Sequence, residues 1–228
     1  MSSEEFTGMV GWMSGLDVHV DTRPLCVRCL RAGSVCLCEG IHRFQTTFQV
    51  VLLQHPKERR NSIGTARFTH LSITGSRLIA GSEFDLDPEV NAILDDPGNA
   101  CYVLFPGPDS VNVATEGKAF LESVSPRKLV IFVIDGTWSH AKGMLRKSSR
   151  LAALPRVSFT IDKPSNYRVR KQPREFCLST VEAVARLLHL LDPAAPSESL
   201  LETFARMVDR QLECATRGKL REKSGVTA

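Results

Sequence analysis

The chain of 228 residues lacks the sequence features that mark several common protein classes. No apolar run approaches the ~20 residues that a membrane-spanning helix requires, so we expect no membrane association. The motifs GxGxxG, GxxxxGK(S/T) and GxSxG are all absent, which argues against a dinucleotide-binding Rossmann site, a P-loop and a hydrolase nucleophile elbow. The acidic, glycine-broken N-terminus has no basic segment followed by an apolar core, so we expect no signal peptide and a cytoplasmic location.

The overall composition is that of a folded globular protein. Hydrophobic residues make up 43% of the chain and charged residues 24%, which is enough apolar material for a buried core. The formal net charge of +4 is modest and does not by itself require a nucleic-acid partner. The length suits one compact domain with a small appendage. We divide the chain into an N-terminal tail (1–22), a cysteine-rich knuckle (23–45), a main catalytic domain (46–217) and a basic C-terminal tail (218–228).

Cysteines are concentrated near the start of the chain, where four of the seven fall within residues 26–38. In a reducing cytosol, such a cluster indicates a bound metal before it indicates disulfides. Four thiolates complete the tetrahedral shell of Zn²⁺, and a closed shell is typical of a structural ion. Buried free cysteines, a redox pair or an iron–sulfur cluster are alternatives. The predicted ligands are Cys26, Cys29, Cys36 and Cys38.

The most informative stretch is an apolar run followed directly by a polar turn. Residues 129–134 (LVIFVI) are mostly β-branched and predict a strand buried on both faces. The run ends in Asp135-Gly136-Thr137-Trp138, after which apolar residues recur at helical spacing. Because ligands bind at the carboxyl ends of strands in open α/β sheets, this turn is a candidate site. The structural alternative is that Asp135 or Thr137 caps the helix and Trp138 belongs to the core.

Strand and helix patterns alternate along the chain and predict an α/β fold with a mostly parallel sheet flanked by helices. Further strands are expected at residues 47–53, around 78–79, at 103–105 and at 157–161. Helices are expected from about residue 61 to 75, at 88–94, from 179 to just before 192, and from 199 to about 218. The last two begin with capping-box patterns, Ser179 with Glu182 and Ser199 with Glu202.

Three turns follow predicted core elements and can meet at one edge of the sheet: FPG at 105–107, DGTW at 135–138 and CLST at 177–180. Basic segments flank them in the sequence: KERR at 57–60, LRKSSR at 145–150 and RVRKQPR at 168–174. A long basic loop with an aromatic residue suits a phosphate backbone and a stacked base, although a solvated charged loop has the same composition. A small-molecule pocket ringed by positive charge indicates an enzyme that modifies a nucleic acid with a cofactor.

The DGTW turn also matches the Asp-x-Thr-Trp signature of the DTW-domain family. The resemblance runs from about residue 23 to the last helix. Its other blocks are the four-cysteine motif, HPKE (55–58), LFPG (104–107), YRVRKQP (167–173) and LSTVEA (178–183). The resemblance implies a SPOUT-like fold with a trefoil knot in its C-terminal half. Knots are rare exceptions to fold rules, and no pattern in the residues themselves predicts this one.

The DTW-domain family includes the tRNA-uridine aminocarboxypropyltransferases. The resemblance therefore implies transfer of a 3-amino-3-carboxypropyl group from S-adenosylmethionine to N3 of a tRNA uridine, with release of 5′-methylthioadenosine. A SPOUT-type RNA methyltransferase with the same co-substrate is one alternative. A zinc-containing RNA-binding module without catalysis is another. The expected partner is tRNA, and the sequence leaves both a monomer and a homodimer open.

Candidate roles follow from the chemistry and the resemblance. Asp135, at the end of an apolar strand, is the candidate general base or uracil-orienting group. Thr137 and Gly136 are expected to contact the co-substrate, while Trp138 stacks on a ring or walls the pocket. The further co-substrate contacts are Phe105, Pro106, Gly107, Leu178, Ser179 and Thr180, the last three at a helix N-terminus. The candidate RNA contacts are Lys57, Arg59, Arg60, Arg146, Lys147, Tyr167, Arg168, Arg170, Lys171 and Arg174. None of the six histidines is assigned a catalytic role.

Overall fold

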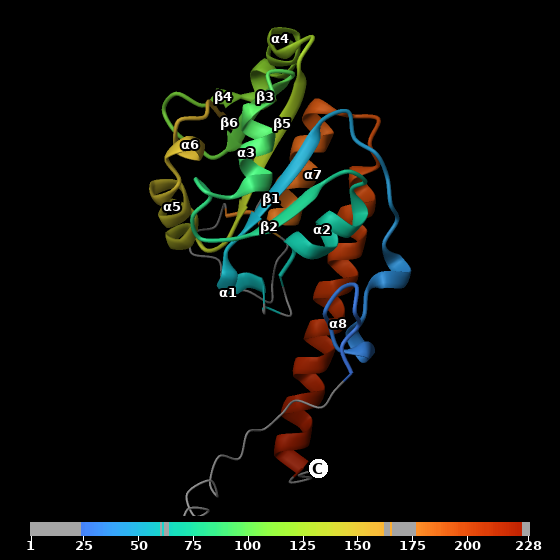
Figure 1. Cartoon of the computed structure of the whole chain (residues 1–228). Coiled ribbons are helices and arrows are strands. Elements are labelled where there is room, and N and C mark those ends of the chain that lie inside the picture. The colour runs from blue at the N-terminus through green and yellow to red at the C-terminus, as the bar shows by residue number, and fades with distance from the viewer. Residues whose placement is uncertain (1–23, 60, 62–63, 162–164, 166–176, 225–228) are drawn as a thin grey trace, which may run out of the picture.

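A computed structural model describes residues 24–59, 61, 64–161, 165 and 177–224, with side chains as far as residue 216. Its centre is a six-stranded sheet in the order β2-β1-β5-β3-β6-β4, and every described strand pairing is parallel (Figure 1). The strands are β1 (Gln49–Gln54), β2 (Arg77–Ala80), β3 (Asn99–Leu104), β4 (Val111–Asn112), β5 (Lys128–Asp135) and β6 (Arg156–Ser158). The prediction of a mostly parallel α/β sheet is confirmed.

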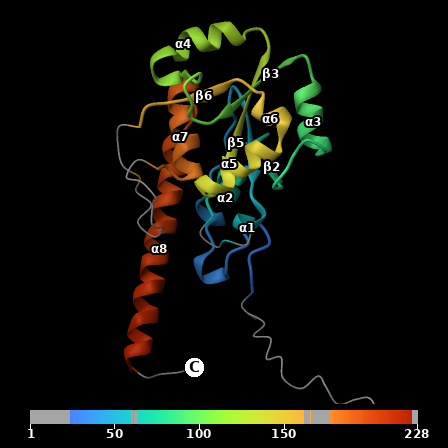
Figure 2. The ribbon, with the colours of Figure 1, turned by 90° about the vertical axis from the view of Figure 1, so that its left-hand side faces the viewer.

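Helices cover both faces of the sheet (Figure 2). One face packs against α2 (Ala66–Ser72), α4 (Val113–Val124), α7 (Thr180–Leu191) and α8 (Ser197–Ser224). The other packs against α3 (Pro88–Asp95), α5 (Trp138–Lys147) and α6 (Ser149–Ala152). The short helix α1 (Pro56–Arg59) follows β1, and the 3-10 turns η1 (Gly33–Val35) and η2 (Cys38–Gly40) belong to the knuckle.

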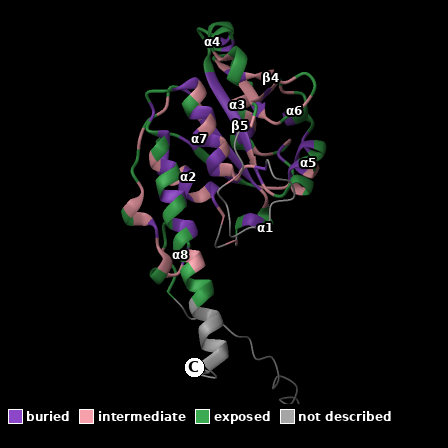
Figure 3. Cartoon of the chain, turned by 180° about the vertical axis from the view of Figure 1, so that it is seen from behind, coloured by how far each residue is buried: buried purple, intermediate pink, exposed green. Residues whose placement is uncertain are grey.

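The alternation of side chains along the central strands separates two cores. In β1, Val50 and Leu52 pack toward the α7 side, whereas Val51 and Leu53 pack toward the α5 side. All four side chains have no exposed surface. The residues of β5 divide in the same way, and Figure 3 shows most of this strand buried. The prediction that residues 129–134 form a strand buried on both faces is therefore confirmed.

The first and last residues of α8 differ from those that the sequence pattern predicts. It starts at Ser197, two residues before the expected cap at Ser199. The Ser199 hydroxyl donates to the carbonyl of Pro196 at 2.8 Å and does not form the expected capping box. The helix then continues past Gly218 to Ser224, so part of the predicted basic tail is helical.

Other boundaries differ because tertiary packing sets them. β6 ends at Ser158, three residues short of the expected end at 161. α2 begins only at Ala66, after the expected start near 61. Helix α4 was not predicted at all, although Val113, Phe120 and Val124 recur at a spacing that places them on one buried helical face.

The knuckle lies beside α8 (Figure 1). Its Gly40 carbonyl accepts hydrogen bonds from Thr203 Oγ1 at 2.9 Å and from Arg206 Nη2 at 2.8 Å. The Arg31 guanidinium is buried and donates to Met207 Sδ at 3.0 Å. These contacts join the start of the chain to its last helix, so the knuckle and α8 stabilise each other.

Candidate functional site at the carboxyl edge of the sheet

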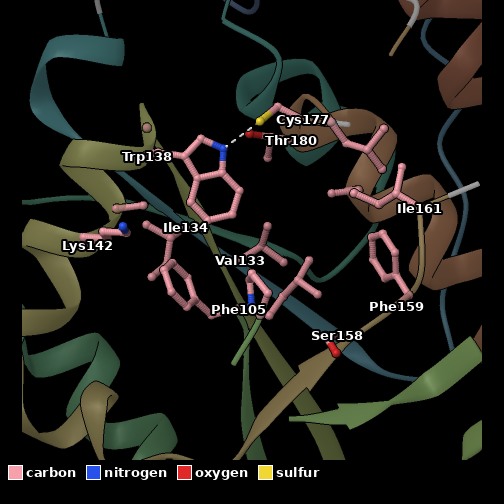
Figure 4. A pocket seen from close by; sticks show the side chains of 16 residues that line it. Phe105, Val133, Ile134, Trp138, Lys142, Ser158, Phe159, Ile161, Cys177 and Thr180 are labelled. Carbon is pink, nitrogen blue, oxygen red and sulfur yellow. Dashed lines mark hydrogen bonds between the residues drawn. The ribbon is translucent and has the colours of Figure 1, made fainter. Parts of the chain in front are cut away.

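The three predicted turns meet around one cavity of about 730 Å³ at the carboxyl edge of the sheet (Figure 4). β3 and β5 are parallel and end at the same edge, and the CLST turn at the start of α7, 70 residues after Gly107 (177 − 107), meets them there. From these turns, the side chains and backbone that line the cavity are Phe105, Pro106, Gly136, Trp138, Cys177, Leu178 and Thr180. The prediction that the turns converge is confirmed.

Four predicted site residues lie next to this cavity but do not line it: Gly107, Asp135, Thr137 and Ser179. Gly107 packs against the Arg156 guanidinium. The Ser179 backbone N–H donates to Glu182 Oε2 at 2.8 Å, which forms the predicted capping box of α7.

Asp135 occupies the end of β5 with only 6% of its surface exposed. One carboxylate oxygen, Oδ2, accepts a hydrogen bond from Gln54 Nε2 at 2.9 Å. The other, Oδ1, accepts one from Thr180 Oγ1 at 2.5 Å. Burial disfavours the ionised carboxylate, whereas donors directed at both oxygens favour it. The two hydrogen bonds therefore hold the buried carboxyl group in a fixed orientation.

Gln54 was not among the predicted site residues. It is the last residue of β1 and lies opposite Asp135 in the β1–β5 register. Its side chain is 3% exposed, and such a buried amide at a strand end requires a polar partner. The sequence feature that could have identified Gln54 as a site residue is its position at the end of an apolar run, just before the HPKE block.

The structure bears out one half of the structural alternative for this turn, the helix cap at Thr137, and not the other, the core position of Trp138. Thr137 Oγ1 accepts from the His140 backbone N–H at 3.2 Å, so it does cap α5. Trp138 is not a core residue, because 41% of its surface is exposed. Its indole Nε1 donates to Cys177 Sγ at 3.0 Å, and its ring meets the edge of Phe105 at a centroid distance of 5.7 Å. Trp138 is thereby fixed as one wall of the cavity (Figure 4).

Two histidines form a stacked pair beside this turn. The rings of His55 and His140 lie parallel with centroids 3.9 Å apart, and their Cβ atoms pack against Gly136. Burial, followed by the charges of His140 and Lys57, lowers the pKa of His55. A Cβ at position 136 would approach His140 Cβ to 3.1 Å, so this tight turn favours glycine. The sequence analysis did not detect the pair because its members are 85 residues apart (140 − 55).

The predicted RNA contacts divide into two groups. Lys57, Arg59, Arg146 and Lys147 are exposed at the ends of α1 and α5, next to the stacked histidines. The charge of Lys147 also contributes to the lowered pKa of His55. The remaining candidates lie outside the described residues: Arg60, Tyr167, Arg168, Arg170, Lys171 and Arg174.

The four predicted metal ligands of the knuckle form one cluster, with all four sulfurs within 4.8 Å of one another. Cys26 Sγ lies 3.6 Å from Cys38 Sγ, and Cys29 Sγ lies 3.7 Å from Cys36 Sγ. None of them forms a disulfide. A tetrahedral zinc ion with bonds of about 2.3 Å to sulfur places its ligands about 3.8 Å apart. The cluster can therefore hold a metal ion.

The ionisation of the thiols also fits a cation at this position. Hydrogen bonds from the backbone of Cys29 and Arg28 lower the pKa of Cys26 to about 6. Burial, followed by hydrogen bonds with the neighbouring thiols, raises the pKa of Cys38 to about 12. A divalent cation among the four sulfurs would lower the pKa values of the thiols and allow all of them to ionise.

Within the described part of the chain, no helix combines the length and apolar character needed to cross a bilayer. The fold and the site define the molecule as an open parallel α/β protein with a small-molecule cavity at its carboxyl edge and a four-cysteine knuckle. It belongs to the DTW domain family, whose model matches residues 23–212.

Curated relatives share most of the chain. The tRNA-uridine aminocarboxypropyltransferase 2 of Mus musculus is 30% identical over 207 residues, which cover 87% of this chain and 67% of the relative. The protein of the same name in Drosophila melanogaster is 31% identical over 191 residues, or 79% and 73% of the two chains. The tRNA-uridine aminocarboxypropyltransferase A of Arabidopsis thaliana is 28% identical over 202 residues, or 78% and 75%. No solved structure matches the chain significantly.

Proposed function

We propose that the protein transfers the 3-amino-3-carboxypropyl group of S-adenosylmethionine to N3 of a tRNA uridine and releases 5′-methylthioadenosine. The observation that carries this proposal is the convergence of three blocks typical of the family around one cavity beside a buried carboxylate. The names of the curated relatives support the same activity.

The cavity suits S-adenosylmethionine in size and chemistry. Its volume of about 730 Å³ falls within the range of about 300–1,000 Å³ that is typical of small-molecule sites. The aromatic faces of Phe105 and Trp138 favour a sulfonium cation and a purine ring. Among the described lining residues, Lys142 is the only charged one, and its ammonium would pair with the carboxylate of the methionine part.

The proposed reaction is a substitution at carbon. The uridine N3–H gives up its proton, and the N3 electron pair forms a bond to the Cγ of the aminocarboxypropyl group. The C–S bond breaks with both electrons passing to sulfur, so the sulfonium leaves as a neutral thioether. Because a sulfonium has three electrophilic carbons, the product depends on which carbon faces the acceptor. Asp135 is the proposed proton acceptor, held in position by Gln54 and Thr180.

We further propose that the knuckle holds a structural Zn²⁺ through Cys26, Cys29, Cys36 and Cys38. The ion would fix the backbone of the knuckle against α8. The same proposal includes a SPOUT-like fold with a C-terminal trefoil knot, a cytoplasmic location and the four-part domain division. The oligomeric state stays open between a monomer and a homodimer.

Nucleoside mass spectrometry tests the proposal directly. Unmodified tRNA transcripts are incubated with the protein and S-adenosylmethionine, digested and analysed. An aminocarboxypropyl-uridine with 5′-methylthioadenosine is the expected result. A methyluridine with S-adenosylhomocysteine would identify a methyltransferase instead. Binding of tRNA without any modification would indicate the RNA-binding module.

A further inference from the structure

A second cavity, of about 490 Å³, lies between the knuckle and the segment that runs from β1 to α2. Figure 2 shows the knuckle close to α1 and α2. Three of its lining residues are arginines and one is a glutamate, so this lining is positive, whereas the first cavity is lined mainly by apolar side chains. The lining of the second cavity includes Leu25, Leu30, Arg31, Glu58, Arg59 and Arg67.

Two charged groups of this lining are buried and held in place. Arg31 and Glu58 are 4% and 6% exposed, respectively. Arg31 Nη2 donates to the Gly64 carbonyl at 3.1 Å, and Asn61 Nδ2 donates to Glu58 Oε2 at 3.0 Å. Because the burial of a charged group is costly unless partners hold it, these contacts fix the shape of the cavity wall.

Arg59 and Arg67 bring two further cations to the cavity, one from α1 and one from α2. Arg59 is exposed and Arg67 is half-buried. Within the described part of the chain, neither guanidinium forms a hydrogen bond or an ion pair with another residue. A guanidinium presents a planar fork of donors that matches a phosphate group. Both arginines are therefore available to an anion that enters the cavity.

The knuckle gives the same cavity an apolar side. Leu25 is 58% exposed and Leu30 is 39% exposed, and both line the cavity. A lone phosphate gains nothing from apolar contacts, whereas the sugar and the base of a nucleotide do. The volume of about 490 Å³ also lies within the range of about 300–1,000 Å³ of small-molecule sites. The lining thus suits a nucleotide, with cations for its phosphate and leucines for its sugar and base.

The two cavities lie side by side along the carboxyl edge of the sheet. Gln54, at the end of β1, lines the second cavity, and Leu104, at the end of β3, lines the first. β5, which ends in the buried Asp135, lies between these two strands. Neighbouring strands are about 4.8 Å apart, so the ends of β1 and β3 are roughly 10 Å apart. A ligand in the second cavity cannot react with a co-substrate in the first, but a polynucleotide strand is long enough to reach both.

We propose that the second cavity binds a nucleotide that flanks the acceptor uridine in the tRNA, a proposal that rests on the proposed function. The acceptor base itself enters the first cavity, where the co-substrate binds. The phosphate of the flanking nucleotide is bound by Arg59 and Arg67, and its sugar and base pack against Leu25 and Leu30. The knuckle thereby forms one side of the RNA-binding site and helps to hold the strand that presents the acceptor.

A first measurement separates RNA binding from co-substrate binding. Arg67→Gln removes one cation from the second cavity, and Arg127→Gln, the control, removes an exposed arginine just before β5 at the opposite edge of the sheet. For Arg67→Gln we expect a loss of about tenfold in tRNA affinity, a salt slope smaller by about one and unchanged S-adenosylmethionine affinity. Arg67→Lys should recover part of the loss, because it restores the charge without the planar fork.

A second measurement identifies the phosphate. Once nucleoside mass spectrometry has located the modified uridine, each nearby phosphate of the tRNA is replaced in turn by an uncharged methylphosphonate on a 2′-O-methyl nucleotide. The same 2′-O-methyl tRNA with an intact phosphate is the reference. At one position next to the uridine, the wild type and Arg127→Gln should lose about tenfold in affinity. Arg67→Gln should lose nothing further there, because its partner for that phosphate is already gone.

The outcomes separate this site from the proposed activity. Losses that add at every position, or tRNA binding by Arg67→Gln equal to that by Arg127→Gln, would overturn the nucleotide site while wild-type modification of tRNA still stands. If circular dichroism shows that Arg67→Gln does not fold, Arg59→Gln enters the same comparison with the same expected result. If the wild-type protein neither binds nor modifies tRNA, both proposals are wrong.

Discussion

At the scale of single residues, the proposed chemistry depends on how Asp135 is held. Its carboxylate is buried, and each oxygen accepts one hydrogen bond from a different element. Gln54 and Thr180 thus fix its orientation, and as hydrogen-bond donors they favour its ionised form. A carboxylate used as a base at neutral pH must remain ionised until the acceptor proton arrives, and these two donors serve that purpose.

Replacing this carboxylate should abolish most of the activity while leaving the fold intact. Asp135→Asn keeps the shape of the side chain but removes the proton acceptor, so turnover should fall by about 10²–10⁴-fold. Circular dichroism and S-adenosylmethionine affinity should stay near the wild-type values. Glu122→Gln, an exposed carboxylate on α4, is the matched control and should leave turnover unchanged. Wild-type turnover by Asp135→Asn would exclude the base role.

Gln54 is a positioning residue, and a pH profile distinguishes that role from a merely structural one. Gln54→Leu removes the donor to Asp135 Oδ2, so the anionic form loses stabilisation. The active, deprotonated form should then require a higher pH. We expect the rising limb of the rate–pH profile to move upward and the maximal rate to fall by about tenfold. A lower rate with an unmoved profile would argue that Gln54 only supports the fold.

At the scale of elements, the knuckle is a small unit that depends on its cysteines and on α8. Three of its contacts to α8 run through the Gly40 carbonyl and the buried Arg31. A segment with two 3-10 turns and few buried side chains has little apolar stabilisation of its own. A bound ion would supply the missing free energy.

Loss of one ligand should therefore release the metal and loosen the knuckle. In Cys29→Ser, bound zinc should fall from about one ion per chain to near zero, and the melting temperature should fall with it. Elemental analysis and thermal unfolding measure the two effects. Cys214→Ser, at an exposed cysteine on α8, should change neither. Equal zinc content in the two variants would contradict the proposed site.

At the scale of the whole molecule, the net charge of +4 does not show where the positive charges lie. Exposed lysines and arginines of the described chain include Lys57 and Arg59 on α1 and Arg146 and Lys147 at the end of α5. A further basic segment, residues 168–174, follows β6 in the sequence. Basic groups of this kind attract an anionic partner.

Replacing Arg168, Arg170 and Arg174 together by glutamine should weaken tRNA binding in a salt-dependent way. If all three contact phosphates, the slope of log K against log salt should decrease in magnitude by about 2–3. Affinity for S-adenosylmethionine should not change. Filter binding at four or more salt concentrations measures the slope. An unchanged slope would show that this segment is a solvated loop that does not contact the RNA.

Local patterns were sufficient to predict much of the site. The apolar run of β5, the turn after it and the four-cysteine spacing each depend on neighbours in the sequence, and each prediction matches the structure. The Thr137 cap and the Ser179–Glu182 capping box are equally local. The pattern failed at the start of α8, where packing decides the boundary, whereas the helical spacing in α4 is present in the sequence and was missed.

The amino-acid sequence by itself determined the fold class, the order of most elements, the turn that carries Asp135 and the metal-binding spacing, because each follows from local periodicity and side-chain chemistry. Only the tertiary structure decided that Gln54 and Thr180 hold the Asp135 carboxylate and that His55 stacks on His140. These contacts join residues distant in the chain, and the strand order and register that create them arise from packing of the whole sheet.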